Sequence, residues 1–232
     1  MKKFILMVFS TILLMGIDLP TSMKTTIQSI NNQNHVTLSN PIPKDRSGIV
    51  IHSYGNGLYA ITHSIVSLGG TKARISKYNM LEHKTIPTIK TPVKIGDSVI
   101  FGNLYNNALL IAPTERIYSS ITKSIKRVWI HPDIYATYLM SNDEDRITLK
   151  NLKGFSIENQ VGLIVIVARE GLRILDPISG KYILKVLYRT NIGASEAQSP
   201  FYARIEQIDT GFFHEESKKE FLPYFQGIDN IK

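Results

Sequence analysis

Residues 162–168 read Gly-Leu-Ile-Val-Ile-Val-Ala, the longest apolar run of the chain after its first 22 residues. The run lacks the alternating polar residues of a strand that has one solvated face. A continuous apolar run of this kind is typical of a strand that is covered on both faces. It therefore predicts a layered α/β unit in the second half of the chain.

The segments on either side of this run alternate between helical and extended patterns. Thr114 is a suitable helix N-cap, and an Ile recurs every four residues behind it at 117, 121 and 125, which predicts a helix. The other expected elements are a strand at 127–130, a short helix capped by Asp133, a helix from Thr148, a hairpin of 172–175 with 182–188, and a last strand at 201–208. Strands that alternate with helices predict a small α/β domain over residues 113–211.

The first half of the chain has a different sequence pattern, in which short expected strands are separated by turn residues. The turn residues recur at Asn31-Asn32, Gly55-Asn-Gly57, Gly69-Gly70 and Gly96-Asp97. The strands expected between them are 25–30, 35–39, 48–53, 58–66, 72–79, 98–101 and 109–112. Short strands with frequent turns favour a small barrel or sandwich, and residues 93–101 resemble a strand of an SH3-like barrel.

The predicted fold class is therefore α+β, with a small N-terminal SH3-like β-barrel over residues 23–112 followed by a small α/β sandwich layer. Residues 212–232 are predicted to form a polar C-terminal tail with a helical turn at 214–221. The sequence contains no internal repeat and no low-complexity tract.

The first 22 residues are typical of a secretory signal. Met1 to Lys3 form a positive start, and residues 4–17 form an apolar run of 14 residues. A helix of that length spans only ~21 Å, short of the ~30 Å hydrocarbon core of a bilayer. Cleavage is expected near Ser22, but Pro20 departs from the small-x-small pattern and leaves an uncleaved membrane tether as the alternative. The protein is expected to be exported to the periplasm or the cell surface.

The composition is that of a globular protein with a basic surface. The chain has 232 residues, 43% of them hydrophobic, and its 27 Lys and Arg residues outnumber its 19 Asp and Glu residues. It has no Cys, which excludes disulfides, thiol nucleophiles and thiolate metal sites. Outside the cytoplasm, a basic surface favours anionic envelope polymers, lipid headgroups or acidic proteins over nucleic acid as partners. A lysine-rich surface that is simply solvated is the simpler interpretation of the same charge. Membrane contact by the chain itself is expected only through an uncleaved signal.

Three patterns suggest a metal site or a proton relay, each weakly. His131-Pro-Asp133 can share a metal or a proton, but a helix start with Asp133 as its cap is the simpler interpretation. Residues 143–145, Asp-Glu-Asp, lack the Gly and the distal Glu of a calcium loop. His52 and His63 lie in adjacent expected strands and can face each other, yet without a third ligand they indicate zinc only weakly.

Nucleophilic catalysis and cofactor binding have no support in the sequence. Ser195 lacks the second Gly of a nucleophile elbow and follows no expected strand. There is no phosphate-binding loop and no dinucleotide fingerprint. An aromatic group serves either as a ligand platform or as core packing; its members are Tyr202, Phe212, Phe213, Tyr224 and Phe225. The chain is therefore predicted not to be an enzyme and to need no cofactor.

Several short sequence motifs, in a fixed order along the chain, resemble those of a known family. They are GIVIHS at 48–53, VKIGDSVI at 93–100, YNNALLIAP at 105–113, WIHPDI at 129–134, GLI at 162–164 and PFY at 200–202. Over about residues 24–208 this order resembles the N-terminal domain of the plasminogen-binding protein A (PgbA) family, exported proteins of Gram-negative bacteria. The WIHPDI stretch is the most specific part of the resemblance.

The resemblance implies an envelope or surface protein that takes part in host interaction and virulence by capturing plasminogen. In the family, binding is attributed to lysines, notably a C-terminal one, that enter the lysine-binding sites of plasminogen kringles. The given chain ends in Lys232, and a terminal lysine offers both an ammonium and a carboxylate to such a site. Lys218 and Lys219, which lie among glutamates, are internal candidates.

The sequence also departs from that family, because members associated with plasminogen binding carry a long lysine-rich extension that the given chain lacks. A second function therefore stays open, namely a periplasmic scaffold or binding module that contacts an envelope protein or polymer.

Overall fold

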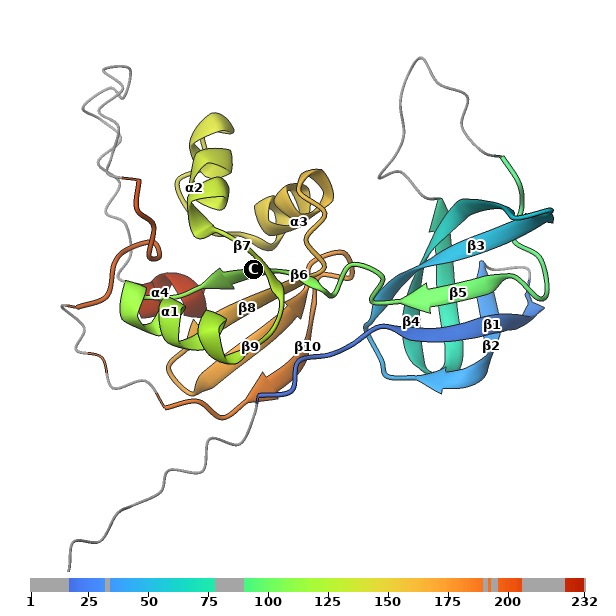
Figure 1. Cartoon of the computed structure of the whole chain (residues 1–232), viewed down its shortest axis with the longest axis horizontal. Helices are drawn as coiled ribbons and strands as arrows, with labels where there is room; N and C mark the ends of the chain where they lie inside the picture. Colours follow the sequence, from blue (N-terminus) through green and yellow to red (C-terminus); the bar gives the residue numbers. More distant parts are fainter. Residues whose placement is uncertain are drawn as a thin grey trace, which may run out of the picture.

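The computed structural model describes residues 17–31, 34–77, 90–189, 192, 196–205 and 224–231. Two sheets lie side by side along the long axis of the molecule, and the helices pack around the second sheet (Figure 1). The described elements are fourteen in number, ten strands and four helices. The prediction of a mixed α+β protein is therefore confirmed.

The first sheet is a closed ring of five strands. The strands are β1 (Met23–Ile30), β2 (His35–Ile42), β3 (Ser47–Gly55), β4 (Leu58–Lys77) and β5 (Ser98–Phe101), in the spatial order β1-β2-β4-β3-β5. Its interior is filled by one apolar cluster that includes Ile27, Leu38, Val50, Ile65 and Phe101. The SH3-like class of this sheet stays a prediction.

Strand β4 makes the closure of this ring possible. All five neighbouring pairs are antiparallel. If five straight strands alternated in direction around a ring, the first and the last would be parallel neighbours. One strand must therefore change direction for every pair to be antiparallel. The first half of β4 pairs with β3, and its second half pairs with β2 from Gly70 onward. Gly69 and Gly70 have φ angles of 97° and 60°, a backbone that only glycine adopts readily. The predicted turn at Gly69-Gly70 is thus the corner of one long strand.

The second sheet combines parallel and antiparallel strands. Its elements in chain order are β6 (Asn107–Ile111), α1 (Glu115–Ser124), β7 (Val128–Ile130), α2 (Pro132–Ser141), α3 (Leu149–Glu158), β8 (Leu163–Ala168), β9 (Gly171–Asp176) and β10 (Lys181–Val186). The spatial order is β10-β9-β8-β6-β7, and β6 runs parallel to both of its neighbours. Every residue of β8 is buried, which confirms the strand predicted from residues 162–168.

Each face of this sheet has its own core cluster. Alternate residues of β6 and β8 point to opposite faces, so Leu110 and Val165 pack with α1 on one face. Leu109 and Ile166 pack with α2 and α3 on the other. Thr114 caps α1 as predicted. Thr148 caps α3 in a reciprocal capping box with Asn151.

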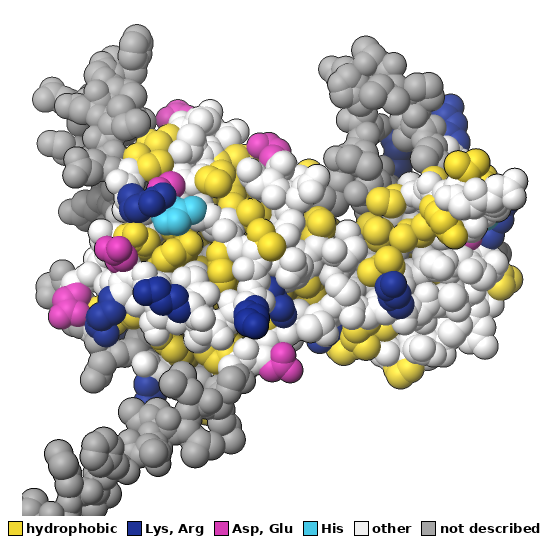
Figure 2. All heavy atoms as spheres, viewed as in Figure 1, with side chains coloured by type: hydrophobic (Ala, Val, Ile, Leu, Met, Phe, Trp, Pro, Cys, Tyr) yellow, Lys and Arg dark blue, Asp and Glu magenta, His cyan; other side chains and the backbone are white. Residues whose placement is uncertain are grey.

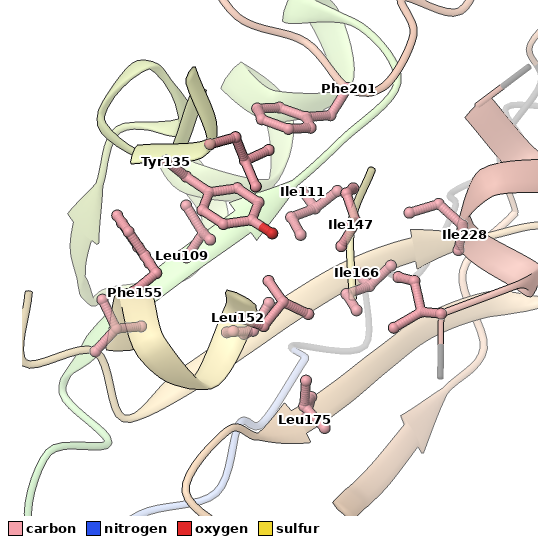
Figure 3. Close-up of a cluster of buried hydrophobic side chains, with 14 of the residues drawn as sticks. Leu109, Ile111, Tyr135, Ile147, Leu152, Phe155, Ile166, Leu175, Phe201 and Ile228 are labelled. Atoms are coloured by element: carbon pink, nitrogen blue, oxygen red, sulfur yellow. The ribbon is translucent and has the colours of Figure 1, made fainter. Parts of the chain in front are cut away.

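The C-terminal residues differ from the expected polar tail. Residues Tyr224–Asp229 form α4, and the side chains of Tyr224, Ile228 and Ile231 are buried. Figure 3 shows Ile228 in the same cluster as Ile111 and Ile166. An apolar residue every three or four positions gives this short segment a face that packs on the sheet.

The described residues test part of one further expectation. The last strand expected at 201–208 is wrong for residues 201–205, which are irregular: Tyr202 makes one backbone hydrogen bond to Ala112, just after β6, and Phe201 packs in the core cluster. Residues 206–208 and the helical turn at 214–221 lie outside the described residues.

The N-terminal signal falls largely outside the described residues, which begin at position 17. Leu19 is buried in the cluster beside α1, and the Arg127 guanidinium donates to the carbonyls of Leu19 and Pro20 at 3.1 and 3.3 Å. The packed chain therefore begins before the cleavage expected near Ser22. Among the described residues, no helix combines the length and the apolar character needed to cross a bilayer.

Candidate functional site

A buried carboxylate joins the two sheets. Asp176 ends β9 and is 0% exposed. Its Oδ2 accepts hydrogen bonds from the Ser47 backbone N–H and the Tyr105 hydroxyl, both at 2.7 Å. Its Oδ1 accepts from the backbone N–H groups of Ile178 and Ser179 at 3.1 and 2.9 Å. Because both oxygens are fully engaged, Asp176 holds the first strand of the β3–β4 hairpin against the β9–β10 turn.

Tyr105 shares this environment. Burial, reinforced by the neighbouring charge of Asp176, raises the pKa of Tyr105 far above its ordinary range. The phenol therefore stays protonated and keeps donating to the carboxylate. These contacts make Asp176 and Tyr105 a structural junction between the sheets.

The second sheet contains a position where related architectures bind ligands. The chain runs from β6 through α1 to β7 and then crosses through α2 and α3 to β8, on the other side of β6. In open α/β sheets, ligands bind outside the carboxyl ends of the strands where the strand order reverses in this way. Here that position lies beyond Ile111 of β6 and Val167 of β8.

The chain itself fills this position. The Tyr224 hydroxyl of α4 lies 3.1 Å from the Ile111 carbonyl and 2.6 Å from the Val167 carbonyl, and it donates to both. The backbone N–H groups of Gln198 and Tyr202 donate to the carbonyls of Pro113 and Ala112, each at 2.8 Å. In the part of the chain that the structure describes, this edge of the sheet is therefore occupied by protein groups.

His131 and Asp133 lie beside this edge, at the start of α2. The helix N-cap is His131, whose Nδ1 accepts from the Asp133 backbone N–H at 3.2 Å. The expectation that Asp133 is the cap is wrong, because its carboxylate instead accepts from the Arg204 backbone N–H and Nε at 2.8 and 2.9 Å. Burial would raise the pKa of Asp133, but the hydrogen bonds from Arg204 together with the charges of His131 and Arg204 outweigh burial and lower the pKa.

The His131 ring lies in an aromatic cluster with two tyrosines. Its centroid is 5.3 Å from that of Tyr118 and 6.3 Å from that of Tyr202. Burial lowers the pKa of His131, and the opposing pull of Asp133 is smaller. Among the described residues, no group of three or more His, Cys, Asp or Glu side chains is placed to hold a metal ion. In this arrangement His131 caps α2, and Asp133 binds Arg204.

The two histidines of the barrel are not cross-strand partners. The register pairs His52 with Ala60, and it pairs His63 with Val50. His52 Nδ1 lies 2.6 Å from Asp97 Oδ1. Burial lowers the pKa of His63. The charge of Asp97, which contacts His52, opposes this effect at His63, so both histidines lie near the same carboxylate although they are not directly paired.

The other predicted candidates fall into two groups. Asp145 pairs with Arg146 in an exposed turn, while Tyr202 and Tyr224 are buried in packing contacts rather than in an open platform. Lys218, Lys219, Lys232 and Ser195 lie outside the described residues, as do Phe212 and Phe213. The sequence analysis missed Asp176 and Tyr105, because their partners lie far away in the chain.

Comparisons with known proteins place these features in context. The family model described as "Plasminogen-binding protein pgbA N-terminal" matches residues 22–229. Two curated relatives named "Plasminogen-binding protein PgbA", from Helicobacter pylori strains J99 and 26695, are 28% and 27% identical over 168 residues. The match covers 70% of this chain and 36% of each relative, so the chain spans about a third of the length of these relatives. No solved structure matches the chain.

Proposed function

Because the chain belongs to the family of plasminogen-binding protein PgbA N-terminal domains, as its motifs predicted, we propose that it is an exported protein that captures plasminogen. The names of the relatives describe plasminogen binding by proteins about three times as long as the matched segment. The family is named for binding rather than for catalysis, and the proposed role is non-catalytic. We place this role at the cell surface, where host plasminogen is accessible.

The proposed contact is lysine recognition by kringle domains, with Lys232 as the main residue and Lys218 and Lys219 as internal candidates. The observation that supports Lys232 is the anchoring of the residues just before it. Ile231 is only 9% exposed, and Tyr224 and Ile228 hold α4 in the core. A lysine that follows an anchored residue loses less backbone freedom on binding than one in a free tail. In a protein that ends at Lys232, the ammonium and the carboxylate are then both presented next to a fixed helix.

The test is binding of immobilised plasminogen, measured by surface plasmon resonance with and without a competing lysine analogue. A protein that ends at Ile231 is expected to lose most analogue-sensitive binding and to keep its fold, because α4 is retained. Lys185→Ala is the matched control, since Lys185 is exposed and pairs only weakly with Glu170 at 3.5 Å. Lys218→Ala with Lys219→Ala measures the internal candidates. Unchanged analogue-sensitive binding in all variants would show that this lysine mechanism is wrong.

The alternative role is a periplasmic scaffold or binding module of an envelope assembly, with a barrel that we propose to be SH3-like as its docking element. The junction at Asp176 favours it, because a scaffold needs its two units held together. Surface labelling separates the two roles. A plasminogen-capturing protein is labelled on intact cells, whereas a periplasmic scaffold is labelled only after the outer membrane is permeabilised.

A further inference from the structure

The net positive charge of the chain is concentrated in residues 23–112. Residues 23–112 contain nine Lys and Arg residues and three Asp and Glu residues, a net charge of +6. Residues 113–232 contain sixteen basic and fifteen acidic residues, a net charge of +1. A charge difference of this size between two parts of a chain indicates an interaction of the basic part with an anionic surface.

One end of the barrel lies away from the second sheet, and we call it the distal end. It consists of the β3–β4 hairpin at 54–59, the turn at 94–97, the end of β1 at Ile30 and the end of β4 near Arg74. The registers place these segments together, because Ser98 pairs with both Ile51 and Thr26, and His35 pairs with Arg74. The opposite end, at Ser47, contacts Asp176. Figure 1 shows the hairpin and the start of β5 at the outer side of the barrel.

Large apolar side chains are exposed at the distal end. Tyr54, Leu58, Tyr59 and Ile95 are between 52% and 69% exposed, and Ile30 is 41% exposed. Figure 2 shows hydrophobic side chains over the surface of this unit, with basic side chains among them. Single exposed apolar residues are ordinary, but a group gathered on neighbouring loops marks an interaction surface.

The loops that carry these side chains are held in place. The hairpin turn at Gly55-Asn-Gly57 has three consecutive positive φ angles, which Gly and Asn tolerate. Asp97 fixes the neighbouring turn, because its carboxylate contacts His52 Nδ1 at 2.6 Å and accepts from the Lys94 backbone N–H at 2.8 Å. A preformed surface loses little conformational entropy on binding.

The exposed charged side chains at the distal end are positive among the described residues. Lys94 and Arg74 are exposed there, and Lys90 is exposed next to Thr91, whose hydroxyl is hydrogen-bonded to the Tyr54 hydroxyl of the hairpin. Of the three acids between residues 23 and 112, Asp97 is buried, Asp45 lies in the turn that leads into β3 at the opposite end, and Glu82 lies outside the described residues. Apolar side chains that protrude beside cations are better suited to a deformable anionic surface than to a rigid pocket of another protein.

We propose that the distal end docks peripherally on an anionic phospholipid bilayer. Tyr54, Leu58, Tyr59 and Ile95 enter the interfacial region, and Lys90 and Lys94 contact the lipid phosphates. Tyrosine suits this position because it has an apolar ring and a polar hydroxyl. Attraction between the lysines and an anionic leaflet is long-ranged only at low salt, so the binding is salt-dependent. This role is independent of plasminogen binding.

The test uses the absence of cysteine from the full chain. Tyr59→Cys is labelled with an environment-sensitive fluorophore, and Leu187→Cys, which is 93% exposed in the second unit, is the matched control. Each protein is mixed with phosphatidylcholine vesicles and with vesicles that also contain phosphatidylglycerol. The probe at position 59 is expected to brighten and shift to the blue only with phosphatidylglycerol, and high salt is expected to reverse the change. The probe at position 187 is expected to stay unchanged.

Charge reversal supplies the second measurement. Lys90→Glu with Lys94→Glu is expected to weaken the response at position 59 by about tenfold or more. Lys181→Glu with Lys185→Glu, on β10, is the control and should leave that response unchanged. No response at position 59, or an equal response at both probe positions, would overturn the proposal. A response to soluble polyglutamate but not to phosphatidylglycerol vesicles would assign the surface to an acidic protein partner instead.

Discussion

The two sheets differ in how their strand edges and strand ends are protected from solvent. The barrel removes its edges by turning β4 back at Gly69-Gly70, and its distal end stays open to solvent. The second sheet leaves β10 and β7 as edges and fills the carboxyl ends of its parallel strands with α4. The position where such sheets usually bind ligands is therefore occupied here by α4, which stabilises the sheet. The exposed apolar side chains gather instead on the barrel, which also carries most of the net positive charge.

The largest expected effect comes from removing the Asp176 side chain, which joins the barrel to the second sheet. Asp176→Ala leaves the Ser47 N–H and the Tyr105 hydroxyl without an acceptor in a buried place. Removing one partner of a buried charged group costs about 3–5 kcal/mol. Urea unfolding followed by far-ultraviolet circular dichroism measures the loss.

The control for this change is Asp229→Ala, because Asp229 makes exposed ion pairs with Arg169 and Arg173. Such pairs contribute under about 1 kcal/mol. Equal losses for Asp176→Ala and Asp229→Ala would contradict the central role of Asp176. A broad or two-step transition in Asp176→Ala would show that the barrel and the second sheet unfold separately once the junction is removed.

Tyr224→Phe tests how α4 closes the second sheet. The change keeps the ring and removes the hydroxyl that bonds the Ile111 and Val167 carbonyls. Leaving buried acceptors unsatisfied costs about 1–3 kcal/mol. The fluorescence of Trp129, the one tryptophan of the chain, reports unfolding of this unit. Tyr182→Phe on β10, where the side chain is partly exposed, should change stability far less.

Gly70→Ala tests the corner that closes the barrel. A Cβ at Gly70 meets no atom within 4 Å, so the cost comes from the backbone alone, whose φ is 60°. A left-handed conformation costs an L-residue about 1–2 kcal/mol. Gly70→Asn is the matched control, because Asn tolerates this conformation better than Ala does. A loss in Gly70→Asn as large as in Gly70→Ala would show that packing rather than backbone strain decides this position.

Local patterns in the sequence predicted most of the elements. The apolar run of β8, the caps at Thr114 and Thr148 and the turn glycines act within a few residues, so one sequence is enough to find them. Contacts between distant segments were not predictable in this way. Asp176 looks like an ordinary turn residue until the fold brings Ser47 to it from 129 residues away. Asp133 likewise is not the helix cap, because its carboxylate accepts a hydrogen bond from Arg204 Nε instead.

Acid titration gives the smallest expected effect, and it compares the two units through one histidine in each. Burial lowers the pKa of His63 in the barrel and of His131 in the second unit below the ordinary value of 6.5. Protonation then favours the unfolded chain, in which the histidines titrate near 6.5. The stability that these groups contribute is present above that pH and falls as the pH decreases through 6.5 toward the lower folded pKa values.

Urea midpoints measured between about pH 7.5 and pH 5 test this coupling. His63→Gln and His131→Gln should each flatten the pH dependence, and the double variant should flatten it by the sum, because the two residues lie in separate units with no shared partner. If both single variants kept the full slope of the parent protein, burial of these two rings would not be the source of the acid sensitivity. If one of the two variants removed the whole slope, the pH dependence of the stability would come from that histidine alone. The barrel and the second sheet would then differ in acid sensitivity, although both histidines are partly buried.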